Sequence, residues 1–561
     1  MWESSHECLD DIPPKVPNND TLPTLDLDAN KDNSNLKPIS KYRKGLPQFL
    51  ATSAVYLNLF DMGMALGFPT IMLPAVQSGN DSVTFTPDQA SWFASLMFIF
   101  QPAGSLISSL ILGWLGRKNT LILINIPYFF VWVTIHLSET VYILMICSIV
   151  LAVNIGYLET PAINYVGEIS TPKLRGILTS YSAPIIYMGI IFEFILGKLF
   201  DWRTVALINS TIPILTIAAM IQIPESPMWL LSKGRNDKAK SALCWLRGWV
   251  KPELILTEFK YLINYKEVSS ERPMTKVYTI DSAIDKNGFA KNNNIDDVKY
   301  FREENVKTVD VDTKKPCKFY NVAANGGNTP NTTCRRETVR SSLSIMFNRE
   351  YVKPFILVSM YFLFYYMSGV PSIRPYLLLI INEMQIPIDP KVCVIFVPTT
   401  GFIGSIVSMC IIKRIGKRPL SLISIGGTAF SALTCGILSY KGTVGSQILP
   451  FIMLLLLAFF TSIGIAAIPW MLLSEVFPLR GRGIASGLVA TVAYALAFGT
   501  AKTFLDLHMR IGLHGVFFLY GSCSVFGLIY LYIWLPETEG KTLHEIELHF
   551  KQKKSKVVQD A

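Results

Sequence analysis

Residues 447–473 read QILPFIMLLLLAFFTSIGIAAIPWMLL, and no charged side chain interrupts them. An α-helix needs about 20 apolar residues to cross the hydrocarbon core of a bilayer. Eleven further segments have a similar length and composition, so we predict an all-α membrane protein with twelve transmembrane helices. The predicted helices cover residues 47–74, 90–114, 120–138, 141–166, 178–200, 204–223, 352–381, 392–412, 419–439, 447–473, 484–507 and 514–535.

The overall composition is typical of a protein embedded in a lipid bilayer. Of the 561 residues, 50% are hydrophobic and 16% are charged, whereas a soluble protein carries about 25% charged residues. The net charge of +10 does not form one basic patch, because the cations lie between the apolar segments, and we expect no nucleic-acid partner. The nine cysteines lack paired spacing, so we expect no disulfides, no metal site and no cofactor.

The placement of basic residues predicts the orientation in the membrane. Cytoplasmic loops are enriched in Lys and Arg, and a basic cluster from Lys37 to Lys44 precedes the first apolar segment. The other cation-rich loops alternate along the chain, so they fall on the same side, and we predict that both termini are cytosolic. Asn80 is then a candidate glycosylation site in the first external loop, whereas the sequon at Asn331 lies on the cytosolic side.

The predicted helices form two groups of six, separated by a long polar segment. We expect a disordered cytosolic tail (1–45), a first six-helix bundle (46–231), a cytosolic linker (232–350), a second six-helix bundle (351–536) and a cytosolic tail (537–561). The linker begins with apolar and charged residues at helical spacing, typical of amphipathic helices on a membrane surface. It continues as a polar insert, which is either a regulatory segment or a tolerated insertion.

Three short motifs occur once in each predicted bundle, in the same order. A basic turn follows the second helix, an acidic-to-basic element follows the fourth, and a Pro-Glu pair ends the sixth. The pairs are Gly116-Arg117-Lys118 with Gly416-Lys417-Arg418, Glu168–Arg175 with Glu475–Arg482, and Pro224-Glu225 with Pro536-Glu537. Such duplication is how many transporters build two bundles that move about a central site.

These motifs resemble the signature segments of the sugar porters of the major facilitator superfamily. The matching stretches are Tyr165-Val-Gly-Glu168 with Arg175-Gly176, Pro224-Glu-Ser-Pro227, Pro469-Trp470 with Ser474-Glu475-Val-Phe-Pro478, and Pro536-Glu-Thr-Glu-Gly-Lys-Thr-Leu543. Within that family the chain resembles the insect trehalose and hexose transporter-like group. The resemblance implies the major facilitator fold, transport of a sugar by alternating access, and a location in the plasma membrane.

The charged motif residues are predicted at the cytosolic ends of helices, where Arg and carboxylates form bidentate pairs. We expect such pairs to join the two bundles and to hold the cytosolic side shut, as a two-state gating network. The alternative is a set of surface ion pairs, each worth about 0–1 kcal/mol. Lys417 stands where the family has Arg, so we expect a weaker pair in the second bundle. The predicted network comprises Arg117, Glu168, Arg175, Glu225, Glu475, Arg482 and Glu537.

The resemblance also implies a sugar site near the bilayer midplane, which the family lines with side-chain amides. In this sequence the corresponding positions hold Ala183, Tyr365-Tyr366, Pro371 and Ala493. A site built to hydrogen-bond its substrate rejects ligands that leave its groups unpaired, so the usual recognition of hexoses is not expected. The predicted substrate-binding residues are Trp470, which the family stacks against the sugar ring, Tyr376, which falls at a family site position, and Tyr365 and Tyr366, whose hydroxyls replace amides.

Asp61 lies inside the first predicted helix. An intramembrane carboxylate is costly and marks a functional site by default, and proton-coupled members of the family have an Asp at this spacing from the following Gly. Asp61 is therefore a candidate for coupling transport to protons; the alternative is a position near a water-filled mouth, with backbone partners. Glu159, Glu193 and Arg374 also fall in apolar segments. Either they pair with each other or with Asp61, or they lie at the outer mouth.

These observations support one leading function and two alternatives. The leading function is transmembrane transport of a sugar (trehalose, a hexose or a similar polyol) by alternating access, as uniport or proton symport. The alternatives are transport of another polar or charged metabolite and a non-transporting sensor that signals through the insert. We expect no enzyme, because the sequence contains no Gly-rich phosphate loop, metal-ligand cluster or nucleophile elbow.

Overall fold

The computed structural model describes residues 41–78, 82–271, 349–441, 448–477, 482–541, 545–546 and 549–550, and all regular structure in them is helical. The N-terminal half contains α1 (Lys41–Gln77), α2 (Pro87–Ile99), α3 (Gln101–Leu115), α4 (Arg117–Leu137), α5 (Val141–Ile169), α6 (Pro172–Ser180), α7 (Ser182–Leu199), α8 (Trp202–Asn209) and α9 (Thr211–Gln222). After it come α10 (Pro227–Ser232), α11 (Asn236–Leu246), η1 (Pro252–Ile255) and α12 (Leu256–Glu271).

The C-terminal half begins at residue 349. Its elements are α14 (Arg349–Tyr366), α15 (Val370–Ile373), η5 (Arg374–Tyr376), α16 (Leu377–Glu383), α17 (Pro390–Ile415), α18 (Lys417–Lys441), α19 (Ile448–Ile463), α20 (Ile468–Glu475) and α21 (Arg482–Trp534). The chain α14–α15–α16 bends where Gly369 adopts a φ of 94°.

The described residues include ten helices that are long and apolar enough to cross a membrane. An eleventh span results if the segments Tyr351–Tyr366 and Val370–Glu383, which meet at 43°, are counted as one. The chain is therefore an all-helical membrane protein. The longest helix, α21, has 53 residues, and its backbone leaves the helical region at Gly512. At 1.5 Å per residue it would be about 80 Å long if straight, more than twice the roughly 30 Å of hydrocarbon in a bilayer.

Within the N-terminal half, small residues let helix backbones touch. A Cβ atom on Gly63 of α1 would lie 2.2 Å from the carbonyl oxygen of Ile186 in α7, and a Cβ atom on Gly189 would lie 2.1 Å from that of Phe60. Small residues have this role in many membrane proteins, because lipid provides little hydrophobic driving force for helix association. Any larger side chain at these two glycines would separate α1 from α7.

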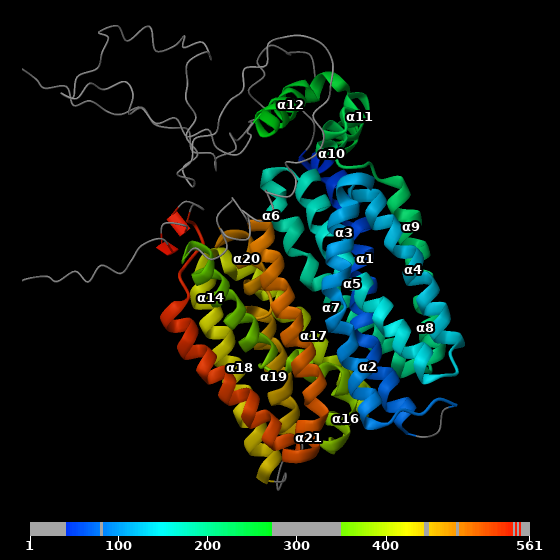
Figure 1. Ribbon diagram of the computed structural model, residues 1–561, viewed down its shortest axis with the longest axis vertical. Helices are drawn as coiled ribbons and strands as arrows, with labels where there is room; N and C mark the ends of the chain where they lie inside the picture. Colours follow the sequence, from blue (N-terminus) through cyan, green and yellow to red (C-terminus); the bar gives the residue numbers. More distant parts are fainter. Residues whose placement is uncertain are drawn as a thin grey trace, which may run out of the picture.

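The two halves lie side by side, and α10, α11 and α12 cover one end of the N-terminal half (Figure 1). We name this end the motif end, because the turns at Gly116 and Gly416 lie at this end of the two halves. The other end is the opposite end. Contacts between the halves run from α1 to η5, from α2 to α21 and from α7 to α17.

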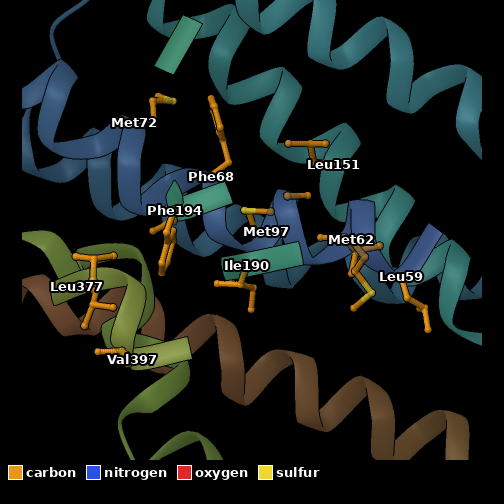
Figure 2. Close-up of a cluster of buried hydrophobic side chains, with 14 of the residues drawn as sticks. Leu59, Met62, Phe68, Met72, Met97, Leu151, Ile190, Phe194, Leu377 and Val397 are labelled. Atoms are coloured by element: carbon orange, nitrogen blue, oxygen red, sulfur yellow. The ribbon is translucent and has the colours of Figure 1, made fainter. Parts of the chain in front are cut away.

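An apolar cluster joins the two halves toward the opposite end. Figure 2 shows Ile190 and Phe194 of α7 beside Leu377 of α16 and Val397 of α17. Met72 of α1 belongs to the same cluster and is buried. The hydrophobic core is therefore continuous from one half to the other in this region.

Polar contacts between the halves also lie toward the opposite end. The Thr70 hydroxyl donates to the carbonyl oxygen of Arg374 (2.6 Å), and the Ser91 hydroxyl donates to that of Lys502 (2.7 Å). The Lys502 ammonium is 2.8 Å from the Asp88 carboxylate. At the motif end the described parts of the halves approach where α6 meets α17, but we find no hydrogen bond or ion pair between them there. The structure is thus held together at the opposite end.

Candidate functional site

The first motif site surrounds the turn between α3 and α4. Gly116 has a φ of 96°, which disfavours any other residue, and a Cβ atom there would lie 2.5 Å from Glu225 Oε2. The Glu225 carboxylate accepts the backbone N–H groups of Arg117 (3.1 Å) and Lys118 (3.0 Å). These groups begin α4, where a negative charge is favourable, so Glu225 caps the helix.

Side chains in the first motif site tie three helices together. The Arg117 guanidinium of α4 donates to Glu168 Oε1 of α5 from Nε (3.0 Å) and Nη2 (2.7 Å). Glu168 Oε2 accepts the hydroxyl of Ser226, which caps α10. The Arg117 and Glu168 side chains are 20% and 22% exposed, so the pair lies below the surface and is screened less than an exposed pair.

The second motif site repeats this backbone geometry between α17 and α18. Gly416 has a φ of 93°, and a Cβ atom there would lie 2.6 Å from Glu537 Oε2. The Glu537 carboxylate accepts the backbone N–H groups of Lys417 (3.0 Å) and Arg418 (2.9 Å) at the start of α18. Glu537 therefore has the capping role of Glu225.

The cation of the second motif site differs from that of the first. Lys417 Nζ is 2.5 Å from Glu475 Oε1 and 3.0 Å from Glu539 Oε2. Glu475 Oε2 accepts the hydroxyl of Thr538 at 2.9 Å, as Glu168 accepts that of Ser226. The Lys417 side chain is 8% exposed, which makes it more buried than Arg117. One lysine thus serves two carboxylates.

The predicted pairing across the two bundles is not seen among the described ion pairs in this arrangement. Arg117–Glu168 lies within the N-terminal half, and Lys417–Glu475 lies within the C-terminal half. Arg175 is exposed on α6, and the side chain of Arg482 lies outside the described residues. The pairs fix helices to one another inside each half, which makes each half more rigid.

The pKa values of the two capping carboxylates shift in opposite directions. Burial raises the pKa of Glu225 above 4.5, the usual value of Glu, and its backbone N–H donors only partly oppose this effect. Burial also raises the pKa of Glu537, but its backbone N–H donors outweigh burial and lower the pKa below 4.5. Burial has the larger effect on Glu225 and the N–H donors have the larger effect on Glu537, which explains the opposite directions.

A group of aromatic side chains lies around the break between α19 and α20. The Trp470 ring meets the Phe362 ring edge-on, with centroids 4.8 Å apart, and Tyr366 stacks on Phe362 at 6.4 Å. Tyr365 contacts Tyr366, with centroids 4.8 Å apart. Trp470 and Tyr365 are only partly buried. Three of the four predicted substrate-binding residues are therefore close together, and two of them are accessible to solvent in part.

Two side-chain hydrogen bonds join the halves near this aromatic group. The Tyr494 hydroxyl of α21 donates to Glu159 Oε2 of α5, and the Tyr494 ring is 5.9 Å from Trp470. The hydroxyls of Tyr187 in α7 and Ser462 in α19 are 2.6 Å apart. The aromatic group thus borders the contact between the halves.

Tyr376 lies apart from this group. Its ring is 2% exposed and stacks on Phe504 of α21, with centroids 5.1 Å apart and an interplanar angle of 13°. It belongs to the apolar cluster that joins the halves toward the opposite end. Its surroundings indicate packing between the halves more than contact with a ligand.

Asp61 lies deep inside the N-terminal half. The residue is 1% exposed, and its Oδ1 accepts the indole N–H of Trp132 in α4 at 3.2 Å. Its Oδ2 has no hydrogen-bond partner among the described residues. The alternative of a water-filled mouth with backbone partners does not fit this burial and this side-chain partner. A buried carboxylate without a cation beside it is far more stable when protonated.

The remaining charged residues of the apolar segments do not pair with Asp61 in the described part of the chain. Glu193 is fully buried, and both of its oxygens lie 3.1 Å from the side-chain nitrogen of Asn209, so its partner is an amide and not a charge. Arg374 lines a small cavity, together with Tyr187 and apolar residues of α17 and α19.

Comparison with known families decides the class of this architecture. The family described as "Sugar (and other) transporter" matches residues 49–280 and 328–550. The chain belongs to this family. Its class is therefore that of a membrane transporter and not of an enzyme.

Curated relatives of this sugar transporter include facilitated trehalose transporters Tret1 from insects. The protein of Culex quinquefasciatus is 25% identical over 89% of this chain and 85% of its own length. The protein of Apis mellifera ligustica is 26% identical over 90% of this chain and 88% of its own length. The match covers only 55% of the Anopheles gambiae protein and 54% of the Aedes aegypti protein.

Solved structures with the same fold include the xylose transporter XylE from E. coli. Its inward-open conformation aligns with a TM-score of 0.64 and 16% identity, over 90% of this chain and 98% of XylE. The proton:xylose symporter XylE bound to 6-bromo-6-deoxy-D-glucose aligns with a TM-score of 0.63 and 15% identity, over 90% of this chain and all of XylE. At this identity the likeness concerns the fold, which confirms the predicted major facilitator architecture.

In this sugar transporter, part of the candidate site was not predicted from the sequence. Tyr494, Tyr187, Ser462 and Trp132 acquire their contacts only because distant helices meet. One signal in the sequence could have identified Tyr494: it directly follows Ala493, a position already assigned to the family's site. The candidate glycosylation residue Asn80 lies outside the described residues.

Proposed function

We propose that this chain carries a neutral sugar or polyol, such as trehalose or a hexose, across the plasma membrane by alternating access. The observation that supports this best is the partly exposed aromatic group around Trp470 at the contact between two halves with repeated motifs. An indole presents an apolar face and one N–H group, which suits the apolar face and hydroxyl rim of a sugar. Trp470, Tyr365 and Tyr366 are the proposed substrate-binding residues; Tyr376 is a weaker candidate because it is buried.

The proposed topology has twelve spans and two cytosolic termini. The break at Gly512 divides α21 into two segments, and each is long enough to cross a bilayer. With the bent pair α14 to α16 counted as one span, each half then has six. We keep the predicted boundaries at residues 46, 231, 351 and 536 as part of this proposal. The motif end faces the cytosol in this topology, in agreement with its cations.

Alternating access requires two arrangements of the same halves. In the described arrangement, polar and apolar contacts hold the halves together toward the opposite end, which corresponds to a state open toward the cytosol. We propose that the motif residues act as a gate in the other state. Rigid halves would approach at the motif end, where Gly176 of α6 and Lys413 of α17 already lie near each other.

Uptake of labelled sugars tests this function. Transport-deficient cells that express the chain at their surface would be offered trehalose, glucose, fructose and a polyol. We expect saturable uptake of at least one, and a loss of about tenfold or more in Trp470→Ala, because truncation removes the stacking surface. Uptake of none of these from surface-exposed protein would contradict the proposal and favour a charged metabolite or a sensor.

We propose that Asp61 couples uptake to protons. Its buried carboxyl has no cationic partner among the described residues, so it can bind and release a proton only when water reaches it. We expect uptake to rise in acidic medium and to lose this pH dependence in Asp61→Asn. Glu139→Gln, at an exposed carboxyl of the opposite end, should keep it. Uptake that is insensitive to pH in all three proteins would identify a uniporter.

A further inference from the structure

Glu159 is a carboxyl group in the middle of the apolar helix α5, and it is partly exposed where the two halves meet. Its Oε2 accepts the hydroxyl of Tyr494, which belongs to the other half. Its Oε1 makes no hydrogen bond with the residues that the structure describes, and no described cation forms an ion pair with it. A carboxylate in an apolar helix is costly unless it has partners, so the free oxygen indicates a ligand.

The surroundings of Glu159 define the chemistry of that ligand. Tyr494 places Glu159 beside Trp470, whose ring is 5.9 Å from the Tyr494 ring. Arg374 lies near the same contact between the halves, where it lines a cavity with Tyr187. The contact thus holds one anionic and one cationic side chain, so a ligand need not carry a net charge.

We propose that Glu159 determines substrate specificity by accepting hydrogen bonds from hydroxyl groups of a neutral polyhydroxylated ligand, while Trp470 contacts the apolar face of its ring. The proposal rests on the function proposed above. Ala183, Pro371 and Ala493 have no side-chain amide to receive a hydroxyl hydrogen. An ionised carboxylate has two acceptor oxygens, and a hydrogen bond to a charged group is worth about twice one between neutral groups.

This position also links binding to the arrangement of the halves. A ligand hydroxyl that donates to Oε1 of Glu159 shares this carboxylate with the Tyr494 hydroxyl on Oε2. The Glu159–Tyr494 bond joins α5 to α21 across the contact between the halves, so the ligand meets Glu159 in this geometry only while that bond is made. A ligand shifts a conformational equilibrium only through such a difference in contacts.

The test is equilibrium exchange in proteoliposomes that contain the full chain, with labelled trehalose and labelled glucose as probes. Monodeoxy analogues of glucose compete for exchange in the wild-type protein and in Glu159→Gln. In wild type, removal of one hydroxyl should weaken competition by about tenfold or more, as expected for a hydrogen bond to a charged group. In Glu159→Gln that difference should shrink to within about threefold, and the KM for the intact sugar should rise.

Three further variants make the result specific. Glu193→Gln changes a fully buried carboxyl that hydrogen-bonds within its own half, and it should discriminate among the analogues as wild type does. Tyr494→Phe keeps the carboxylate, so it should keep the discrimination while changing the exchange rate. If Glu159→Gln is not folded in detergent by its melting temperature, Glu159→Asp replaces it, and an intermediate discrimination is expected.

Three results would overturn the inference. Unchanged discrimination in Glu159→Gln would show that Glu159 does not touch the ligand, although transport of sugar stands. Stabilisation of the wild-type protein by glucosamine or choline but not by glucose or trehalose, lost in Glu159→Gln, would identify a cationic ligand. Failure of the wild-type protein to exchange either sugar would reject the proposed function itself, and this outcome is visible before any variant is compared.

Discussion

The two motif sites have the same backbone geometry but a different cation. Gly116 and Gly416 have φ angles of 96° and 93°, and each turn packs against a carboxylate that caps the next helix. In the first site Arg117 gives two N–H groups to one oxygen of Glu168, whereas in the second Lys417 contacts two carboxylates. The same fold therefore accepts a forked cation in one half and a point charge in the other.

The second carboxylate near Lys417 changes the expected effect of having Lys where the first site has Arg. The sequence predicts a weaker pair at Lys417, because Lys lacks the fork of Arg. The structure provides a second acid, Glu539, at 3.0 Å from Lys417 Nζ, and buries the lysine more deeply than Arg117. A compact ammonium group can sit between two carboxylates, so geometry at the second site compensates for the loss of the fork. The relative strength of the two sites remains a prediction.

The largest expected effect concerns the glycine with a positive φ that both motif turns contain. Gly116→Ala and Gly416→Ala should each destabilise the protein by at least about 1–3 kcal/mol, the cost of the backbone strain. Each added Cβ atom also meets a carboxylate oxygen at 2.5 or 2.6 Å, which increases the cost. We expect similar falls in the melting temperature in detergent for the two variants. Gly113→Ala and Gly487→Ala are matched controls, since a Cβ atom there meets nothing within 4 Å. A large fall in only one of the two motif variants would contradict the equivalence of the turns.

Much of this fold was predictable because bilayers impose simple rules. Apolar length predicted the helices, and the repeated motifs predicted the two halves. The Gly-Arg-Lys pattern at residues 116–118 was informative because a positive φ, a cation and a helix start are local properties. The partners of Arg117 and Lys417 lie 51 and 58 residues away, and nothing in the spacing tells whether a charge pairs within a half or across halves.

The next effect tests the difference between the cations. Lys417→Met removes the charge between Glu475 and Glu539 and leaves two carboxylates close together without a cation. Arg117→Met leaves only Glu168 without its cation. Loss of one partner of a buried pair costs up to about 3–5 kcal/mol, and we expect less here because both sites are partly exposed. The fall in melting temperature should be larger for Lys417→Met. A larger fall for Arg117→Met would show that the fork outweighs the second acid.

A smaller effect is expected when the cations are exchanged. Arg117→Lys keeps the charge but loses one of two N–H donors to Glu168, and we expect a destabilisation of about 1 kcal/mol, the usual worth of one hydrogen bond. Lys417→Arg introduces a larger group at a side chain that is 8% exposed, so it should not stabilise the protein. Melting temperatures of both variants in one detergent give the comparison. A gain in stability for Lys417→Arg would contradict the view that the second site is fitted to lysine.

The candidate substrate site was less predictable than the motif sites. Trp470 was identified through the resemblance to a family, and its place beside Tyr365 and Tyr366 depends on the break between α19 and α20 and the bend at Gly369. The hydrogen bond from Tyr494 to Glu159 spans 335 residues. A sequence places each of these side chains on a helix, but the contact between two halves decides which of them meet, and that contact changes between transport states.

The smallest expected effect is a difference in the response of the two caps to pH. The pKa of Glu225 is raised, so the folded protein binds this proton more readily than the unfolded chain, and the contribution of Glu225 to stability increases as the pH falls toward 4.5. The pKa of Glu537 is lowered, so its contribution is fully present above 4.5 and declines as the pH falls below that value. Melting temperatures are measured from about pH 7 to about pH 4. As the pH falls, wild type should gain stability relative to Glu225→Gln and lose stability relative to Glu537→Gln. Each change should stay below about 1 kcal/mol, because both carboxylates are partly exposed. The comparison uses only the slope of each melting-temperature difference against pH, because the amide of Gln adds a constant offset at each site. Two slopes of the same sign would contradict the opposite pKa shifts of the two carboxylates.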